Sequence, residues 1–185
     1  MPHIRAFIAV EIDQPSRQKI SSLISGLKKS NADVKWITED QMHLTLKFLG
    51  NIDEGKIHEI SSALSSISHD FKPFEITLSD IGAFPNLDHP RVIWIEIEKG
   101  ADLLKTLAGK IDSRLEKLGF QKETREFKAH LTLGRVRTSK NMPQLVKIIN
   151  ETQFAPETGV KINELILFQS TLTPKGTIYT KLWTT

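Results

Sequence analysis

The chain has 185 residues, and its 25 Lys and Arg against 22 Asp and Glu give a formal net charge of +3 with neutral histidine. This length fits one domain, or one domain made of two similar halves. The mild positive charge permits a phosphate-bearing ligand but excludes the dense basic field of a protein that coats duplex DNA. Because the sequence has no cysteine, disulfides, iron–sulfur clusters, thiolate zinc sites and a cysteine nucleophile are excluded.

The apolar run over residues 4–12 carries charges and is too short for a membrane span or the apolar core of a signal peptide. We therefore expect a cytoplasmic protein without a membrane partner.

Hydrophobic periodicity predicts a regular order of strands and helices. In the first half, the order is a strand over 4–12, a helix after Pro15, strands over 34–37 and 43–49, a helix over 57–67 and a strand over 74–81. From about residue 90 the order starts again, with a strand over 91–97, a helix over 101–118, a strand over 130–136, a helix from about 142 and a strand over 160–168.

An exact four-residue repeat marks this duplication. The segment from His43 to Leu46 reads His-Leu-Thr-Leu and recurs from His130 to Leu133, an offset of 130 minus 43, or 87 residues. We therefore expect an α+β fold with two lobes related by a pseudo-twofold axis, each with an antiparallel sheet packed by helices, and an active-site groove between them. The whole chain, 1–185, is expected to be one domain with halves of approximately 1–88 and 89–185.

The repeated segment has the chemistry of a phosphodiester site. In a strand, residues i and i+2 share a face, so His43 lies beside Thr45, and His130 lies beside Thr132. Near neutral pH one imidazole can act as a base and the other as an acid, while the hydroxyls donate hydrogen bonds to phosphate oxygens. A single strand histidine is more often an ordinary structural residue, but duplication that keeps both His-x-Thr pairs favours catalysis.

Arg135 is a candidate phosphate ligand with an open orientation. Its guanidinium suits a phosphate, but simple alternation places it on the leucine face unless Gly134 permits a bulge. Phe84, Phe168 and Tyr179 are candidates for stacking on a base, or ordinary core aromatics. No metal-binding cluster and no glycine-rich nucleotide loop occurs in the sequence, so we expect no metal and no cofactor.

The two motifs, at this separation, resemble those of the two-histidine phosphoesterase superfamily. The fuller pattern is similar to its RNA 2′,3′-cyclic phosphodiesterase branch, also known as bacterial and archaeal 2′-5′ RNA ligases. The resemblance spans nearly the whole chain and is carried by residues 5–9, 42–50, 89–94, 130–135 and 167–170, with Gly176 and Tyr179. Ala129 precedes the second histidine, where the family often has proline.

The resemblance implies hydrolysis of RNA 2′,3′-cyclic phosphate ends to 2′-phosphomonoesters. His43 would donate a proton to the departing 3′ oxygen, and His130 would accept a proton from water. Thr45, Thr132 and Arg135 would bind the phosphate. The implied partner is RNA with a cyclic phosphate end, such as a tRNA fragment, the implied state is a monomer, and the reverse 2′-5′ ligation is compatible with the same site.

Two alternatives stay open at this point. The first is a noncatalytic module that binds RNA ends. The second is a phosphodiesterase for small cyclic nucleotides or cyclic ADP-ribose phosphate.

Overall fold

We describe a computed structural model of the chain, which covers residues 2–69, 71–152, 154, 157–174 and 176–185. Its helices are α1 (Gln14–Leu27), α2 (Ile57–Ser68), α3 (Ala101–Glu116) and α4 (Met142–Glu151). Its strands are β1 (His3–Glu11), β2 (Val34–Trp36), β3 (His43–Asp53), β4 (Phe74–Phe84), β5 (Val92–Ile97), β6 (His130–Val136), β7 (Glu157–Ile162), β8 (Leu165–Thr173) and β9 (Gly176–Thr184).

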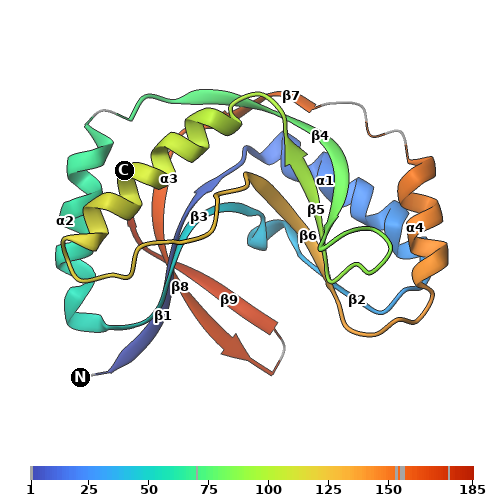
Figure 1. Cartoon of the computed structure of the whole chain (residues 1–185), viewed down its shortest axis with the longest axis horizontal. Helices are drawn as coiled ribbons and strands as arrows, with labels where there is room; N and C mark the ends of the chain where they lie inside the picture. The colour runs from blue at the N-terminus through green and yellow to red at the C-terminus, as the bar shows by residue number, and fades with distance from the viewer. Residues whose placement is uncertain (1, 70, 153, 155–156, 175) are drawn as a thin grey trace.

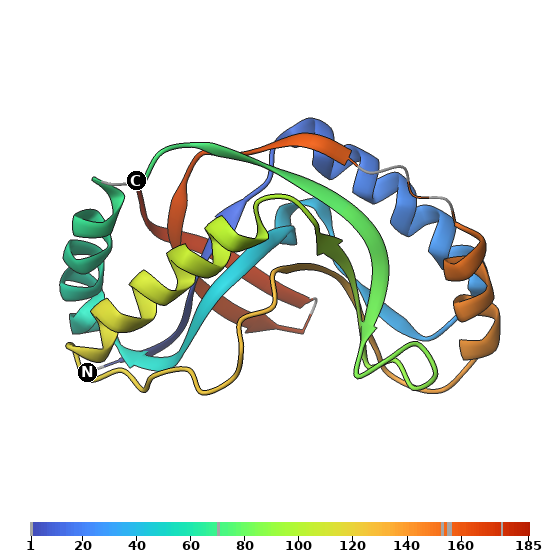
Figure 2. The same ribbon diagram turned by 45° about the horizontal axis from the view of Figure 1, so that its top comes forward.

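The strands form two antiparallel sheets, which confirms the expected α+β fold (Figure 1). One sheet has the order β3-β1-β8-β9, and the other has the order β2-β6-β5-β4-β7. Helices α2 and α3 contact each other beside the first sheet, whereas α1 and α4 contact each other beside the second (Figure 2). No helix in the part of the chain described here is long and apolar enough to cross a membrane.

Each lobe is assembled from both halves of the sequence. Strand β8, from the second half, pairs with β1, and β4, from the first half, pairs with β5. The triplets β3-β1-β8 and β6-β5-β4 are thus equivalent three-stranded units that have exchanged their third strands. Because this exchange buries apolar side chains of both halves together, one contiguous core runs through both lobes.

The C-terminal region differs from the sequence prediction. The single strand expected over 160–168 is divided into β7 and β8, which belong to different sheets. Asn163 and Glu164 join them, and both are exposed where the chain crosses between the sheets. Because Ile162 and Leu165 on either side are fully buried, hydrophobic pattern alone did not mark the break. Strand β9 was not predicted.

Candidate active site

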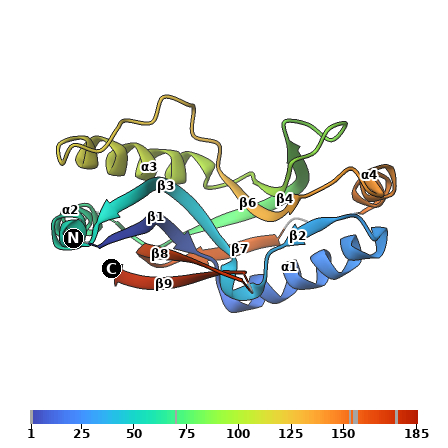
Figure 3. The ribbon, with the colours of Figure 1, turned by 90° about the horizontal axis from the view of Figure 1, so that it is seen from below.

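The two predicted histidines occupy equivalent places in the fold, each as the first residue of its strand. His43 begins β3 and His130 begins β6. These two strands contact each other between the lobes (Figure 3). In both strands the His and Thr side chains are half-buried, whereas the leucines between and after them are buried. This confirms the predicted alternation. We call the surface formed by His43, Thr45, His130, Thr132 and Arg135 the histidine face.

Both strands contain a bulge at the same position. Ile8 and Ala9 of β1 pair with Lys47 and Thr45, so Leu46 has no opposite residue. Likewise, consecutive residues of β5 pair with Gly134 and Thr132, which leaves Leu133 without one. The two bulged leucines are 133 minus 46, or 87, residues apart, the same offset as the histidines.

The bulge corrects the orientation that simple alternation gives for Arg135. One extra residue reverses the side to which later residues point, so Arg135 lies on the face of His130 and Thr132 and is exposed, while Gly134 is buried. A Cβ atom at Gly134 would lie 2.7 Å from Val34 and 2.9 Å from the Trp36 ring. Glycine at this position therefore lets β2 pack closely against the bulged strand.

Phe48 is the counterpart of Arg135 in the first lobe, and the sequence analysis missed it. It lies 87 residues before Arg135, follows the equivalent bulge and is 65% exposed. Its ring centroid lies 6.2 Å from that of Phe7, which in turn lies 4.8 Å from the imidazole of His43. The repeat offset was the signal that could have found it. An exposed ring at this position can stack on a base.

A stacked pair of aromatic rings supports each histidine. Phe7 and Phe168 stack at 5.2 Å beside His43. In the other lobe Phe84 and Trp94 stack at 4.9 Å, and Phe84 meets the His130 ring edge to face at 5.0 Å. Phe168 is 4% exposed. It and Phe84 thus pack against the histidines.

Tyr179 also borders this site. Its half-buried ring is perpendicular to the imidazole of His43, with the ring centroids 5.0 Å apart. Burial raises the pKa of Tyr179, although the nearby charges of Arg135 and Arg5 act in the opposite direction.

Each imidazole has a backbone hydrogen bond to the residue two positions earlier. Nδ1 of His130 lies 2.7 Å from the carbonyl oxygen of Lys128, two residues earlier. His43 has a backbone hydrogen bond with Gln41, also two residues earlier. A ring fixed through one nitrogen presents the other to a ligand, so His130 is oriented for proton transfer at Nε2.

Burial makes both histidines weakly basic. Desolvation lowers the pKa of His43 to about 4, while the Gln41 backbone and Glu11, its cross-strand partner, favour the protonated form. The pKa of His130 is also lowered, chiefly by burial and further by the charges of Lys128 and Arg135. Near neutral pH both imidazoles are thus uncharged in the free protein, and the charge of Arg135 acts on both of them.

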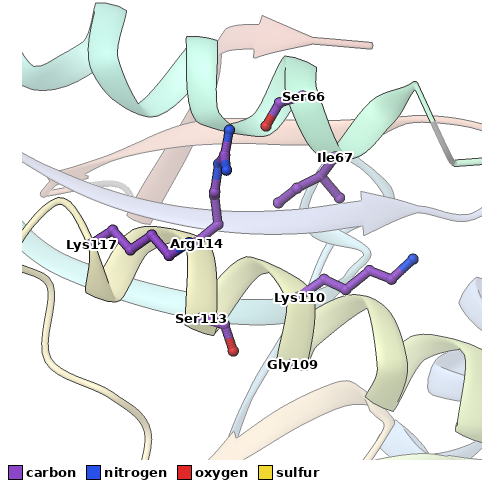
Figure 4. Close-up of a pocket in the computed structure, with 7 residues that line it drawn as sticks. All are labelled: Ser66, Ile67, Gly109, Lys110, Ser113, Arg114 and Lys117. Atoms are coloured by element: carbon purple, nitrogen blue, oxygen red, sulfur yellow. The ribbon is translucent and has the colours of Figure 1, made fainter.

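Within the described ranges, no group of three or more His, Cys, Asp or Glu side chains is arranged to hold a metal ion. A surface hollow lies between α2 and the C-terminal part of α3, away from the histidine face (Figure 4). Its lining contains none of the predicted site residues and consists of Ser66, Ile67, Gly109, Lys110, Ser113, Arg114 and Lys117.

Comparison with known proteins gives consistent matches over the whole chain. The family model described as LigT like phosphoesterase matches twice, at residues 10–94 and 95–179. A Methanothermobacter thermautotrophicus protein named RNA 2′,3′-cyclic phosphodiesterase is 35% identical, covering 97% of this chain and 96% of its own. An Archaeoglobus fulgidus protein of the same name is 36% identical, covering 97% and 98%.

Solved structures give the same fold. The crystal structure of TT0787 of Thermus thermophilus superposes with a TM-score of 0.76 at 25% identity, covering 98% of this chain and 96% of that one. Escherichia coli LigT complexed with 3′-AMP gives a TM-score of 0.72 at 24% identity, covering 100% and 98%. These matches confirm the resemblance that the two motifs indicated.

Proposed function

Because the chain belongs to the LigT-like phosphoesterase family, we propose that it hydrolyses RNA 2′,3′-cyclic phosphate ends to 2′-phosphomonoesters, with His43 and His130 as acid and base. Membership in this family makes the chain a hydrolase of phosphoric diesters, as the sequence analysis expected. The observation that carries the proposed mechanism is the paired arrangement of the two strands, in which one arginine charge acts on both imidazoles.

The reaction needs one proton acceptor and one proton donor. His130 takes a proton from water as its oxygen attacks phosphorus, and His43 gives a proton to the 3′ oxygen as the bond between that oxygen and phosphorus breaks. The bond to the 2′ oxygen remains, so the product is a 2′-phosphomonoester. Proton exchange with solvent then removes the proton from His130 and returns one to His43.

Thr45, Thr132 and Arg135 stabilise the phosphate during this step. The hydroxyls donate to its non-bridging oxygens, and the guanidinium offsets the charge that develops there. His43 must be protonated to act as the acid, although it is neutral in the free protein near pH 7. The bound anionic phosphate raises its pKa, because a nearby negative charge favours the imidazolium. Substrate binding therefore favours protonation of His43, the proton donor.

No step is assigned to a metal ion or a nucleotide cofactor. If an RNA hydroxyl attacked phosphorus in place of water, the same bond to the 3′ oxygen would break and the product would be a 2′-5′ ligated RNA. All five residues of the histidine face come from one chain, so we expect an active monomer. RNA fragments such as tRNA halves, in the cytoplasm, are the expected substrates.

The test incubates the purified protein, with EDTA and without ATP, with a short RNA that ends in a 2′,3′-cyclic phosphate. The product is compared by chromatography with 2′- and 3′-phosphate standards. We expect a 2′-phosphate from the wild type and from His58→Ala, whose histidine is exposed on α2. His43→Ala and His130→Ala should each lose at least about 1,000-fold in kcat.

Other outcomes point to the alternatives. RNA binding without conversion would support a noncatalytic end-binding module. Conversion of cyclic mononucleotides alone would support an enzyme for small cyclic nucleotides. Loss of activity in EDTA that a divalent ion restores would replace the metal-independent mechanism.

A further inference from the structure

Strand β2 extends the second sheet beside the strand of His130, whereas in the described part of the chain the first sheet has no such strand beside His43. It pairs with the outer edge of β6, so the second sheet continues past the strand that carries His130. The equivalent strand β3 is the edge of the first sheet. The two sheets are therefore not equivalent beside the histidine strands, since β2 lies next to β6 and, among the residues that the structure describes, no strand lies on the outer side of β3 (Figure 1).

Lys35 lies directly opposite Arg135 on this extension. The two residues are register partners in the β2–β6 pair, and both are exposed. Val34 and Trp36, on either side of Lys35, pack against the core. Because alternate residues of a strand point to opposite faces, Lys35 shares the face of Arg135.

Two cations in this arrangement repel each other. Like charges directly opposite on neighbouring strands are destabilising, and neither residue forms an ion pair with a carboxylate in the ranges that the structure covers. Just outside the two strands, the backbone N–H of Arg137 donates a hydrogen bond of 2.9 Å to the carbonyl oxygen of Asp33. The Asp33 carboxylate accepts a hydrogen bond from Thr138 at 3.1 Å. Beside Lys35 and Arg135, Arg137 adds a third exposed cation.

Exposed cationic side chains continue from the histidine face along the end of β6 and onto β2. The charge of Arg135 acts on both imidazoles, and exposed Arg137 directly follows the end of β6. Lys35 adds a further positive charge on the neighbouring strand β2. In the proposed mechanism the reacting phosphate binds at the histidine face, so exposed Lys35 lies beside it, where a second anionic group of the same ligand can bind.

We propose that Lys35, beside Arg135, binds the phosphodiester that precedes the reacting end, so that the site takes an RNA oligonucleotide in preference to a cyclic mononucleotide. This inference rests on the proposed function and specifies its substrate class. A cyclic mononucleotide has no such phosphodiester and cannot use the contact. Binding at β2 is then a contact to the sugar–phosphate backbone, without sequence preference.

The test compares two substrates of the same chemistry, an RNA hexamer ending in a 2′,3′-cyclic phosphate and the corresponding cyclic mononucleotide. For Lys35→Gln, we expect the ratio of kcat/KM for the hexamer to that for the mononucleotide to fall at least fivefold. The slope of log kcat/KM for the hexamer against log salt concentration should become shallower by about 0.7, the value for one lost contact to a single strand. Lys110→Gln, which removes an exposed lysine on α3, should change neither quantity.

The outcomes separate this inference from the proposed function. An equal fall on both substrates, or no fall on either, would overturn the role of Lys35 while leaving cyclic phosphate hydrolysis intact. A wild-type protein that converts neither substrate would overturn the proposed function itself. Thermal melting of Lys35→Gln at the wild-type temperature would exclude misfolding as the cause of a lowered ratio.

Discussion

The carbonyl oxygen of Lys128 lies 2.7 Å from Nδ1 of His130 and fixes which ring nitrogen faces the substrate. A carbonyl accepts only, so Nδ1 must carry the proton and Nε2 must hold the lone pair that a general base requires. We expect nitrogen NMR of the imidazole to show the Nδ1–H tautomer for His130 at neutral pH. A dominant Nε2–H tautomer would contradict the assignment of His130 as the base.

The pH dependence of activity should reflect the lowered histidine pKa values. The base must be neutral and the acid protonated, so kcat/KM should be bell-shaped, with its maximum below about pH 6.5, because kcat/KM reports the free enzyme. The maximum of kcat should lie at higher pH, since bound phosphate raises the pKa of His43. Steady-state rates on the cyclic-ended hexamer test both points, and a flat profile from about pH 5 to 9 would contradict the mechanism.

Burial of neutral His43 should make folding stability depend on pH. Its pKa falls from 6.5 to about 4 on folding, so between these values the unfolded chain binds the proton and the native protein does not. The free energy of unfolding has its full value above pH 6.5. It decreases as the pH falls towards 4, by at most about 3 kcal/mol. Urea unfolding should show a smaller loss for His43→Gln than for the wild type. His58→Gln on α2 should keep the wild-type loss.

Gly82 should position Trp94, and through it His130. A Cβ atom at Gly82 would lie 2.5 to 2.9 Å from three atoms of the Trp94 indole, which stacks on Phe84 beside the histidine. Gly82→Ala must therefore displace a rigid ring. We expect a loss of about 1–3 kcal/mol in the free energy of unfolding, together with a lower kcat.

A matched glycine provides the control for this variant. Gly109, inside α3, has open space where its Cβ would lie, so Gly109→Ala should keep wild-type kcat and gain slightly in stability because alanine favours the helix. Equal kcat values for the two variants would show that the Trp94 ring does not hold His130 in place.

An ion pair between buried Lys47 and half-buried Asp112 should stabilise the segment that leads from α3 to β6. Lys47 on β3 is 7% exposed, donates to the carboxylate of Asp112 on α3, and donates to the carbonyl of Gln121 at 2.9 Å. Asp112→Asn would leave the buried ammonium without its counter-charge, and we expect a loss of about 3 kcal/mol by urea unfolding. The double variant Lys47→Met/Asp112→Leu should recover most of that loss.

The exposed pair of Lys105 and Glu126 is the control for this measurement. Glu126→Gln should give no measurable change, because solvent screens exposed charges. A double variant no more stable than Asp112→Asn would show that the uncompensated charge of Lys47 is not the cause of the loss.

The amino-acid sequence by itself determined the features of this protein that depend on neighbouring residues. Alternation along 43–46 and 130–133 predicted which side chains share a face, and apolar spacing predicted the four helices, because both patterns are properties of a single segment. The exact repeat also predicted two equivalent lobes and paired the histidines. The family resemblance, carried by the same motifs, was confirmed as well.

Tertiary structure decided the features that need partners distant in the sequence. The exchange of β4 and β8 between the lobes, and the strand break after Ile162, depend on pairing that no local pattern encodes. The bulge at Leu133 turns Arg135 towards the histidines because β5 fixes the register. Lys35 becomes its neighbour only when β2 joins the second sheet. The lowered pKa values arise from desolvation, which exists only once the strands have assembled.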